Sequence, residues 1–162
     1  MRHSTVFGLL AVVLLSCFFT ACSQRDKVYG VSGSGDDTEM NAAIAKARET
    51  LPSFWRELEN PQAGAHGFSL KVKITDKGET KQFWADGIER KDGKVFGTID
   101  NDAEKFRRVI LRKRIEIPDQ NIIDWAFVMN KKMFGNYTFR VFMKRMPKDE
   151  ADKYKAILEN LP

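Results

Sequence analysis

The spacing of apolar and polar residues changes along the chain, and each spacing predicts a different element. After a Gly/Ser-rich stretch, apolar side chains recur at helical spacing, which predicts a helix that begins at Asp37 or Thr38. The apolar positions are Met40, Ala43, Ile44, Ala47 and Leu51. We expect Pro52 to interrupt this helix, and residues 53–58 to restart as a turn or a short helix.

From Gly67 the period changes to two. Apolar side chains alternate with polar ones over residues 68–75, which predicts a half-buried strand. Turn residues at 76–78 and at 92–93 separate this segment from predicted strands over 80–90 and 94–100. Three strands joined by short turns predict an antiparallel meander.

The second half of the chain is less regular. We expect a short helix at 102–106, a strand in the second half of 108–117, and another strand over 122–129. Residues 137–146 fit both a strand and a helix, and their β-branched and aromatic content after Gly135 favours a strand. Residues 147–158 are predicted to be a helix that begins with a proline. The elements together predict an α+β fold with an N-terminal helix, a twisted antiparallel sheet of about five strands and a C-terminal helix.

The N-terminus has the pattern of an export signal. Arg2 is followed by an apolar stretch over residues 6–19, which is too short for a membrane-spanning helix and typical of a signal peptide. The sequence Phe19-Thr20-Ala21-Cys22 resembles a lipobox, so we expect cleavage before Cys22 and acylation of its thiol. Cys17 is the alternative, although the large Leu15 stands where a small residue is preferred. The expected organisation is a signal peptide over 1–21, an acylated cysteine and flexible tether over 22–37, and one domain over 38–162.

The lipobox also implies a location. Ser23 follows the acylated cysteine, and by the sorting rules of lipoproteins a serine there directs the protein to the outer membrane. We therefore expect an exported protein, anchored in the bacterial cell envelope by its acyl chains and facing the periplasm. Its expected partners are the membrane and either a protein or an anionic envelope ligand. Export removes nucleic acid as a partner.

Composition excludes several kinds of chemistry. The chain is 43% hydrophobic with a net charge of +5, which is ordinary for one globular domain. Without the signal peptide it keeps one histidine, His66, which we expect in a solvated loop, and one cysteine. We therefore expect no Cys–His catalysis, no zinc site, no disulfide framework and no cofactor. A hydrolase remains conceivable only through clustered carboxylates, for which the candidates are Asp86, Glu89, Asp100 and Asp124.

Arg112, Lys113 and Arg114 form a basic patch before a predicted strand. In an exported protein such a patch suits lipid phosphate, lipopolysaccharide or an acidic protein. The simpler interpretation of the basic patch is that its side chains form a solvated face of the strand.

Five short motifs occur in one order along residues 40–158 and resemble the YegJ-like domain of unknown function, the DUF2314 family. They are Phe83-Trp84-Ala85-Asp86, Gly97-Thr98-Ile99-Asp100-Asn101, Ile115-Glu116-Ile117-Pro118, Ile122-Ile123-Asp124-Trp125 and Gly135-Asn136-Tyr137-Thr138-Phe139-Arg140-Val141. The chain departs from the family in having Arg112-Lys113-Arg114 where a Gly-Asp pair is usual. The resemblance implies a small α+β domain without an established activity.

The motifs select a candidate cluster for binding or for defining the fold. Its members are Trp84, Asp100, Asn101, Asp124, Trp125, Tyr137 and Arg140. Our leading hypothesis is a non-catalytic, lipid-anchored envelope protein whose domain binds another macromolecule. The alternatives are a small envelope hydrolase and an immunity-type protein against a toxin.

Overall fold

The structure is a computed structural model, and it describes residues 37–76, 78–99 and 114–159. The N-terminal helix α1 (Thr38–Glu59) is followed by strands β1 (His66–Asp76), β2 (Glu79–Lys91), β3 (Lys94–Ile99) and β4 (Arg114–Ile117). A 3-10 turn η1 (Asp119–Asn121) leads to β5 (Ile122–Met129) and β6 (Lys132–Gly135). Two short helices, α2 (Tyr137–Lys144) and α3 (Lys148–Lys155), complete the α+β fold.

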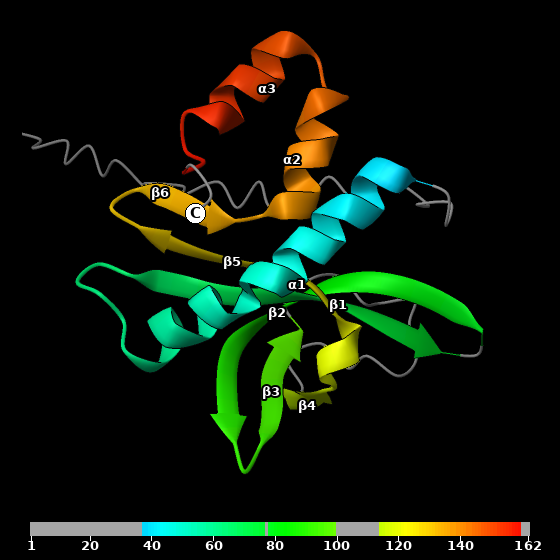
Figure 1. The fold of residues 1–162 in the computed structure, drawn as a ribbon, viewed down its shortest axis with the longest axis vertical. Coiled ribbons are helices and arrows are strands. Elements are labelled where there is room, and N and C mark those ends of the chain that lie inside the picture. Colours follow the sequence, from blue (N-terminus) through cyan, green and yellow to red (C-terminus); the bar gives the residue numbers. More distant parts are fainter. Residues whose placement is uncertain (1–36, 77, 100–113, 160–162) are drawn as a thin grey trace, which may run out of the picture. The chain divides into compact units, whose positions relative to one another are not determined.

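The six strands form one sheet in the order β4-β3-β2-β1-β5-β6, and all neighbours are antiparallel. The predicted meander is β1, β2 and β3, and β4 extends it on one side. The chain then returns through η1 to place β5 on the free side of β1 (Figure 1). The sheet has one strand more than we expected, because β6 forms a hairpin with β5 through Asn130 and Lys131, two residues with positive φ that the pattern of apolar residues does not mark.

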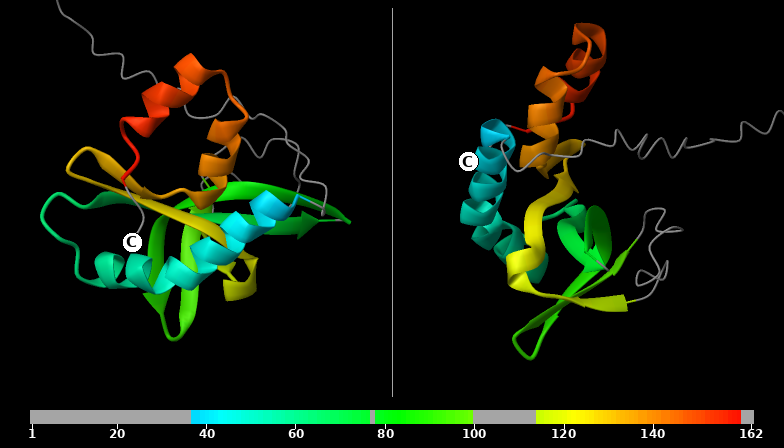
Figure 2. Two further views of the ribbon diagram at one scale, coloured as in Figure 1. Left: turned by 45° about the horizontal axis from the view of Figure 1, so that its top comes forward. Right: turned by 90° about the vertical axis from the view of Figure 1, so that its right-hand side faces the viewer.

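Helix α1 covers one face of the sheet, and the hydrophobic core lies between them (Figures 1 and 2). Phe54 of α1 is completely buried, and its ring centroid lies 5.9 Å from that of Trp125 on β5. The apolar side of each strand fills the rest of this layer: Leu70, Val72, Phe83, Ala85, Val95, Ile99, Ile117, Ile122 and Phe127. Burial of these side chains is the main favourable contribution to folding.

Two sequence predictions about helices are wrong. Helix α1 continues through Pro52 rather than ending there. Pro52 cannot donate a backbone hydrogen bond to the carbonyl of Arg48, but buried Ala47 and Phe54 hold the helix against the sheet on both sides of the proline. Residues 137–144 form helix α2 and not a strand, because the carboxylate of Asp124 accepts hydrogen bonds from the first N–H groups of this helix.

The remaining boundaries shift by a few residues. The C-terminal helix is shorter than predicted and covers Lys148–Lys155. His66 opens β1 instead of lying in a loop, although its side chain is exposed as expected. The helix predicted at 102–106 lies outside the described residues. Among the helices that the structure describes, none combines the length and apolar character needed to cross a membrane.

Candidate functional site

The strand register gathers the polar residues of the sequence motifs on the sheet face opposite the core. Lys71 on β1 pairs with Trp84 on β2 and with Asp124 on β5. Asp86 on β2 pairs with Thr98 on β3, which pairs in turn with Arg114 on β4. Directly paired residues of antiparallel strands project to the same side. We call these six residues (Lys71, Trp84, Asp86, Thr98, Arg114 and Asp124) the polar face.

Asp124 is completely buried at one end of the polar face and accepts four hydrogen bonds. One carboxylate oxygen accepts from the backbone N–H of Trp125 at 2.8 Å and of Tyr137 at 3.1 Å. The other accepts from the backbone N–H of Thr138 at 2.8 Å and from its hydroxyl at 2.7 Å. The carboxylate therefore caps the N-terminus of α2 from a strand 13 residues earlier in the chain.

This cap explains why residues 137–144 form a helix. Asn136 precedes α2 in a left-handed conformation, and its side chain makes no capping hydrogen bond. Gly135 has a φ of +76°, and a Cβ there would lie 2.1 Å from the carbonyl oxygen of Trp125. Only glycine fits this close turn, which places the first N–H groups of α2 on Asp124.

Burial raises the pKa of Asp124, because the charged carboxylate has lost its water. The hydrogen bonds from Thr138, Trp125 and Tyr137 oppose this effect. The folded protein therefore holds a proton on this carboxyl more tightly than the unfolded chain does.

Lys71 joins the buried cap to the half-buried middle of the polar face. Its ammonium donates to the Thr138 hydroxyl at 3.3 Å. The same ammonium lies 5.9 Å from the ring centroid of Trp84 and 5.8 Å from that of Phe142 on α2. Two aromatic rings and a hydroxyl thus lie around a half-buried cation.

Arg114, the residue of the basic patch that the structure describes, does not stand free at the other end of the polar face. Arg114 forms an ion pair with Glu89 at 2.6 Å, and its guanidinium lies 4.7 Å from the ring centroid of Phe96. Its charge is therefore already balanced by a neighbour. Arg112, Lys113, Asp100 and Asn101 lie outside the described residues.

The other predicted cluster members lie away from the polar face. Trp125 is buried in the core, and its indole N–H donates to the carbonyl of Ala47 at 3.0 Å. Tyr137 is buried beside it, with ring centroids 5.8 Å apart, and burial raises the pKa of its phenol. Trp125 thus contacts α1, and Tyr137 packs α2 against β5. The candidate cluster is thus split between a polar face and a core.

Arg140 has a structural position at the opposite side of α2. Its guanidinium donates to the carbonyl oxygens of Gly135 at 3.1 Å and Glu159 at 2.6 Å. Burial lowers its pKa from the ordinary value. Arg140 therefore ties the start of α2 to the C-terminal segment.

Of the carboxylates considered for hydrolysis, the three that the structure describes, Asp86, Glu89 and Asp124, do not form a catalytic pair. Asp86 and Asp124 are separated by β1 and by an offset of two residues along it, which places their backbones about 12 Å apart. Asp124 is sealed from solvent and already accepts four hydrogen bonds. Glu89 is engaged by Arg114. Within the described ranges, no three His, Cys, Asp or Glu side chains come together as metal ligands.

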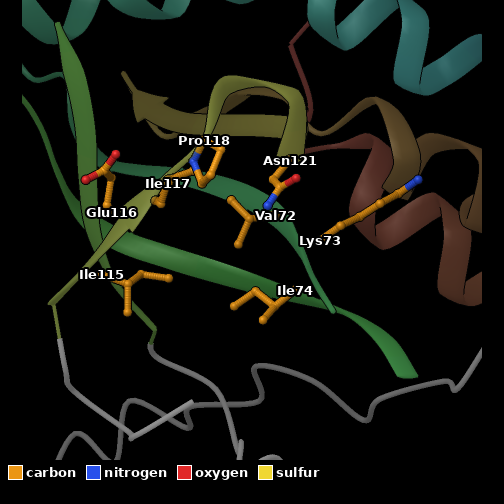
Figure 3. A pocket seen from close by; sticks show the side chains of 8 residues that line it. All are labelled: Val72, Lys73, Ile74, Ile115, Glu116, Ile117, Pro118 and Asn121. Carbon is orange, nitrogen blue, oxygen red and sulfur yellow. The ribbon is translucent and has the colours of Figure 1, made fainter. Parts of the chain in front are cut away.

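A separate groove opens between β1 and the segment that runs from β4 to η1 (Figure 3). It has a volume of about 340 Å³ and is lined mainly by apolar side chains, with Lys73, Glu116 and Asn121 at its edge. The apolar lining consists of Val72, Ile74, Ile115, Ile117 and Pro118. It holds no pair of groups that suggests catalysis.

Sequence reasoning missed Lys71, Thr138 and Phe142. Lys71 is one of several lysines that alternate with apolar residues in β1, so nothing local distinguishes it. Thr138 and Phe142 reach Lys71 only because 137–144 is a helix. The Thr138 position within the last motif was the one available signal.

The antiparallel six-stranded sheet with one long covering helix defines the class of protein as a small α+β domain. A family of uncharacterized proteins conserved in bacteria, DUF2314, matches residues 37–159, and the chain belongs to this family. The match includes every described residue. The resemblance expected from the five motifs is confirmed.

Two relatives show where this domain occurs. The uncharacterized protein YegJ of Escherichia coli K12 is 30% identical over 150 residues, which cover 93% of this chain and 97% of YegJ. A putative ankyrin repeat protein of Neisseria meningitidis serogroup B is 27% identical over 128 residues, which cover 74% of this chain and 51% of that protein. The chain thus spans about half of the ankyrin repeat relative. No solved structure shows significant similarity to the chain.

Proposed function

We propose that this chain is a lipid-anchored protein of the bacterial cell envelope whose α+β domain is a non-catalytic binding module. The carrying observation is the full engagement of Asp124, the most buried polar group of the sequence motifs. A catalytic carboxylate needs access to its substrate. A carboxylate that is sealed and fully hydrogen-bonded serves the fold instead.

The binding surface we propose is the half-buried part of the polar face around Lys71, Trp84 and Asp86. Trp84 is a side-chain type that protein interfaces favour at their centres, and Lys71 and Asp86 flank it with opposite charges on the same sheet face. A protein is a better partner than an anionic lipid, because Arg114 already pairs with Glu89. The Neisseria relative supports the same choice, since repeat arrays of the kind its name describes present extended binding surfaces.

The anchor is proposed from the sequence Phe19-Thr20-Ala21-Cys22 and the Gly/Ser-rich stretch that follows it. An acyl anchor with a flexible spacer lets a folded domain reach partners near the membrane. Labelling cells with a palmitate analogue tests this part. Label is expected on the wild type and on Cys17→Ala, and it is expected to be lost from Cys22→Ala. Label that persists in Cys22→Ala overturns the assignment of the anchor.

The binding surface is tested by crosslinking the full chain in its own envelope. Trp84→Ala is expected to remove the crosslinked partner. Trp55→Ala is the matched control, because Trp55 is also a half-buried tryptophan stacked on a cation, Arg90 at 4.9 Å, but lies on α1. Equal crosslinking by both variants contradicts the proposed surface.

A further inference from the structure

The C-terminal segment covers the outer edge of the sheet. After α3, Leu158 forms a parallel bridge with Met133 on β6. The backbone N–H of Met133 donates to the carbonyl of Ile157 at 2.7 Å, and the N–H of Glu159 donates to the carbonyl of Met133 at 2.9 Å. The edge of β6 is therefore an acceptor for an extended peptide, and the chain's own end occupies it.

Two cations extend this acceptor edge. Lys132 donates to the carbonyl of Ala156 at 2.8 Å, and Arg140 donates to the carbonyl of Glu159 at 2.6 Å. Both side chains bind backbone oxygens, so they recognise an extended backbone rather than a particular side chain. We call residues 148–159, which comprise α3 and this segment, the strap.

The strap is attached to its own copy by few side chains. Within α3, Ala151 is the one buried residue, and Tyr154 contacts Phe139 of α2 edge to face at 4.9 Å between centroids. Lys148 and Lys155 both pair with Asp152, so these ion pairs lie inside the helix. Most of the strap's attachment is the acceptor edge itself.

A short hinge connects the strap to the domain. Helix α2 ends at Lys144, and Lys144 and Arg145 pair with Glu39 and Asp37 at the start of α1. Only Met146 and Pro147 separate this fixed point from α3. Pro147 is exposed and extended, with φ −52° and ψ 141°, and it prevents α2 from continuing into α3.

We propose that the β6 edge is a strand-acceptor site for a second copy of this chain, and that two copies associate by exchanging their straps. A strap bound to the partner copy makes the same hydrogen bonds as a strap bound to its own copy. The exchange therefore loses no contacts, and its cost is the entropy of association. The tethered strap competes at an effective concentration in the millimolar range. The conformation of the hinge therefore decides whether the β6 edge binds the strap of its own copy or the strap of the partner copy.

Pro147→Ala in the full chain tests the proposal. Loss of the proline lets α2 and α3 join into one helix, which carries the strap away from its own β6 edge. The association constant for a dimer, measured by light scattering in detergent, is expected to rise at least about tenfold. Pro118→Ala is the matched control, since Pro118 is also exposed and extended before a helical turn, with φ −63° and ψ 135°.

Hydrogen exchange at the amide of Met133 shows whether a strap fills the β6 edge in the dimer. This amide must stay protected in the Pro147→Ala dimer, because the partner's strap fills the edge. A monomeric Pro147→Ala chain, or a dimer whose Met133 amide exchanges rapidly, overturns the proposal.

A second measurement covers the case in which Pro147→Ala does not fold. A labelled peptide of residues 148–162 is added to the full chain carrying Ala151→Asp, which loosens the strap at its buried residue. The peptide is expected to bind this variant at least about tenfold more tightly than it binds the wild type or Ala45→Asp, where the alanine is exposed on α1. Equal binding to all three chains overturns the proposal.

Discussion

The two ends of α2 are held by carboxylates in opposite ways. At the N-terminus, Asp124 is completely buried and bonded to three backbone N–H groups and one hydroxyl. At the C-terminus, Asp37 and Glu39 are paired with the charged side chains of Arg145 and Lys144 near the surface. The buried arrangement stabilises the helix through directed hydrogen bonds in a low dielectric. The exposed arrangement stabilises it through charge attraction in water.

The pKa shifts of the carboxyl groups at the two ends of α2 have opposite signs, because one end is buried and the other is paired with cations in water. Burial raises the pKa of Asp124, whereas hydrogen bonds from Arg145 and Lys144 lower the pKa values of Asp37 and Glu39. The buried end therefore contributes stability that falls as pH rises through its raised pKa. The exposed end contributes stability that falls as pH drops through its lowered pKa values.

Asp124→Ala is expected to have the largest effect. The substitution leaves three backbone N–H groups and the Thr138 hydroxyl without their acceptor in a buried place. We expect a loss of about 3 kcal/mol or more in the free energy of unfolding, measured by urea denaturation. Asp119→Ala, at an exposed position in η1, is the control. A loss no greater than that of the control contradicts the role of Asp124 as the cap of α2.

Asp124→Asn is expected to have a smaller effect that depends on pH. The amide keeps one acceptor oxygen but presents a donor to the N–H of Thr138, so we expect a loss of about 2 kcal/mol near pH 4. As pH rises, the wild type bears the cost of a buried charge that the variant lacks. The difference between the two proteins in urea denaturation should therefore shrink from pH 4 to pH 8. A difference that grows over this range shows that the pKa of Asp124 is lowered, not raised.

These two predictions concern a contact that sequence periodicity does not reveal. Helix α1 up to Pro52, the meander β1–β3 and strand β5 follow from local periods in the sequence. Helix α2 depends on a cap that comes from a distant strand and on a left-handed Asn136, so its local signal favours a strand. The position of a residue on the polar face or in the core follows from the strand register, which local spacing does not determine.

The candidate site shows the same division. Trp84 and Asp124 were found through their motifs and share the polar face. Trp125 belongs to the same motif as Asp124, and Tyr137 belongs to the last motif, but both project into the core. A motif in a strand carries both faces at once, because successive side chains alternate. Only the pairing of the strands separates binding candidates from packing residues.

Thr138→Val is expected to have a moderate effect at the buried end. Valine keeps the shape of threonine but removes one hydrogen bond to the carboxylate and the acceptor for Lys71. We expect a loss of about 1–2 kcal/mol in the free energy of unfolding by urea denaturation. Thr50→Val is the matched control, because the Thr50 hydroxyl also accepts one N–H, from the Trp125 indole at 3.3 Å, but donates to the neutral carbonyl of Lys46 at 2.9 Å. If the control loses as much stability, the charge of Asp124 adds nothing to the bond.

Arg145→Ala is expected to have the smallest effect, at the exposed end. Arg145 donates to both carboxylate oxygens of Asp37, at 2.6 and 2.9 Å, but its neighbourhood is open to water. A surface pair of this kind adds little stability, because water and salt screen it. The melting temperature should fall slightly at low salt and match the wild type at about 1 M salt, where the screening length is about 3 Å. The melting temperature of Thr138→Val, measured in the same way, should stay below that of the wild type at high salt. If the melting temperature of Arg145→Ala also stays below that of the wild type at high salt, the two ends of α2 are held by the same kind of interaction. The contrast between them is then wrong.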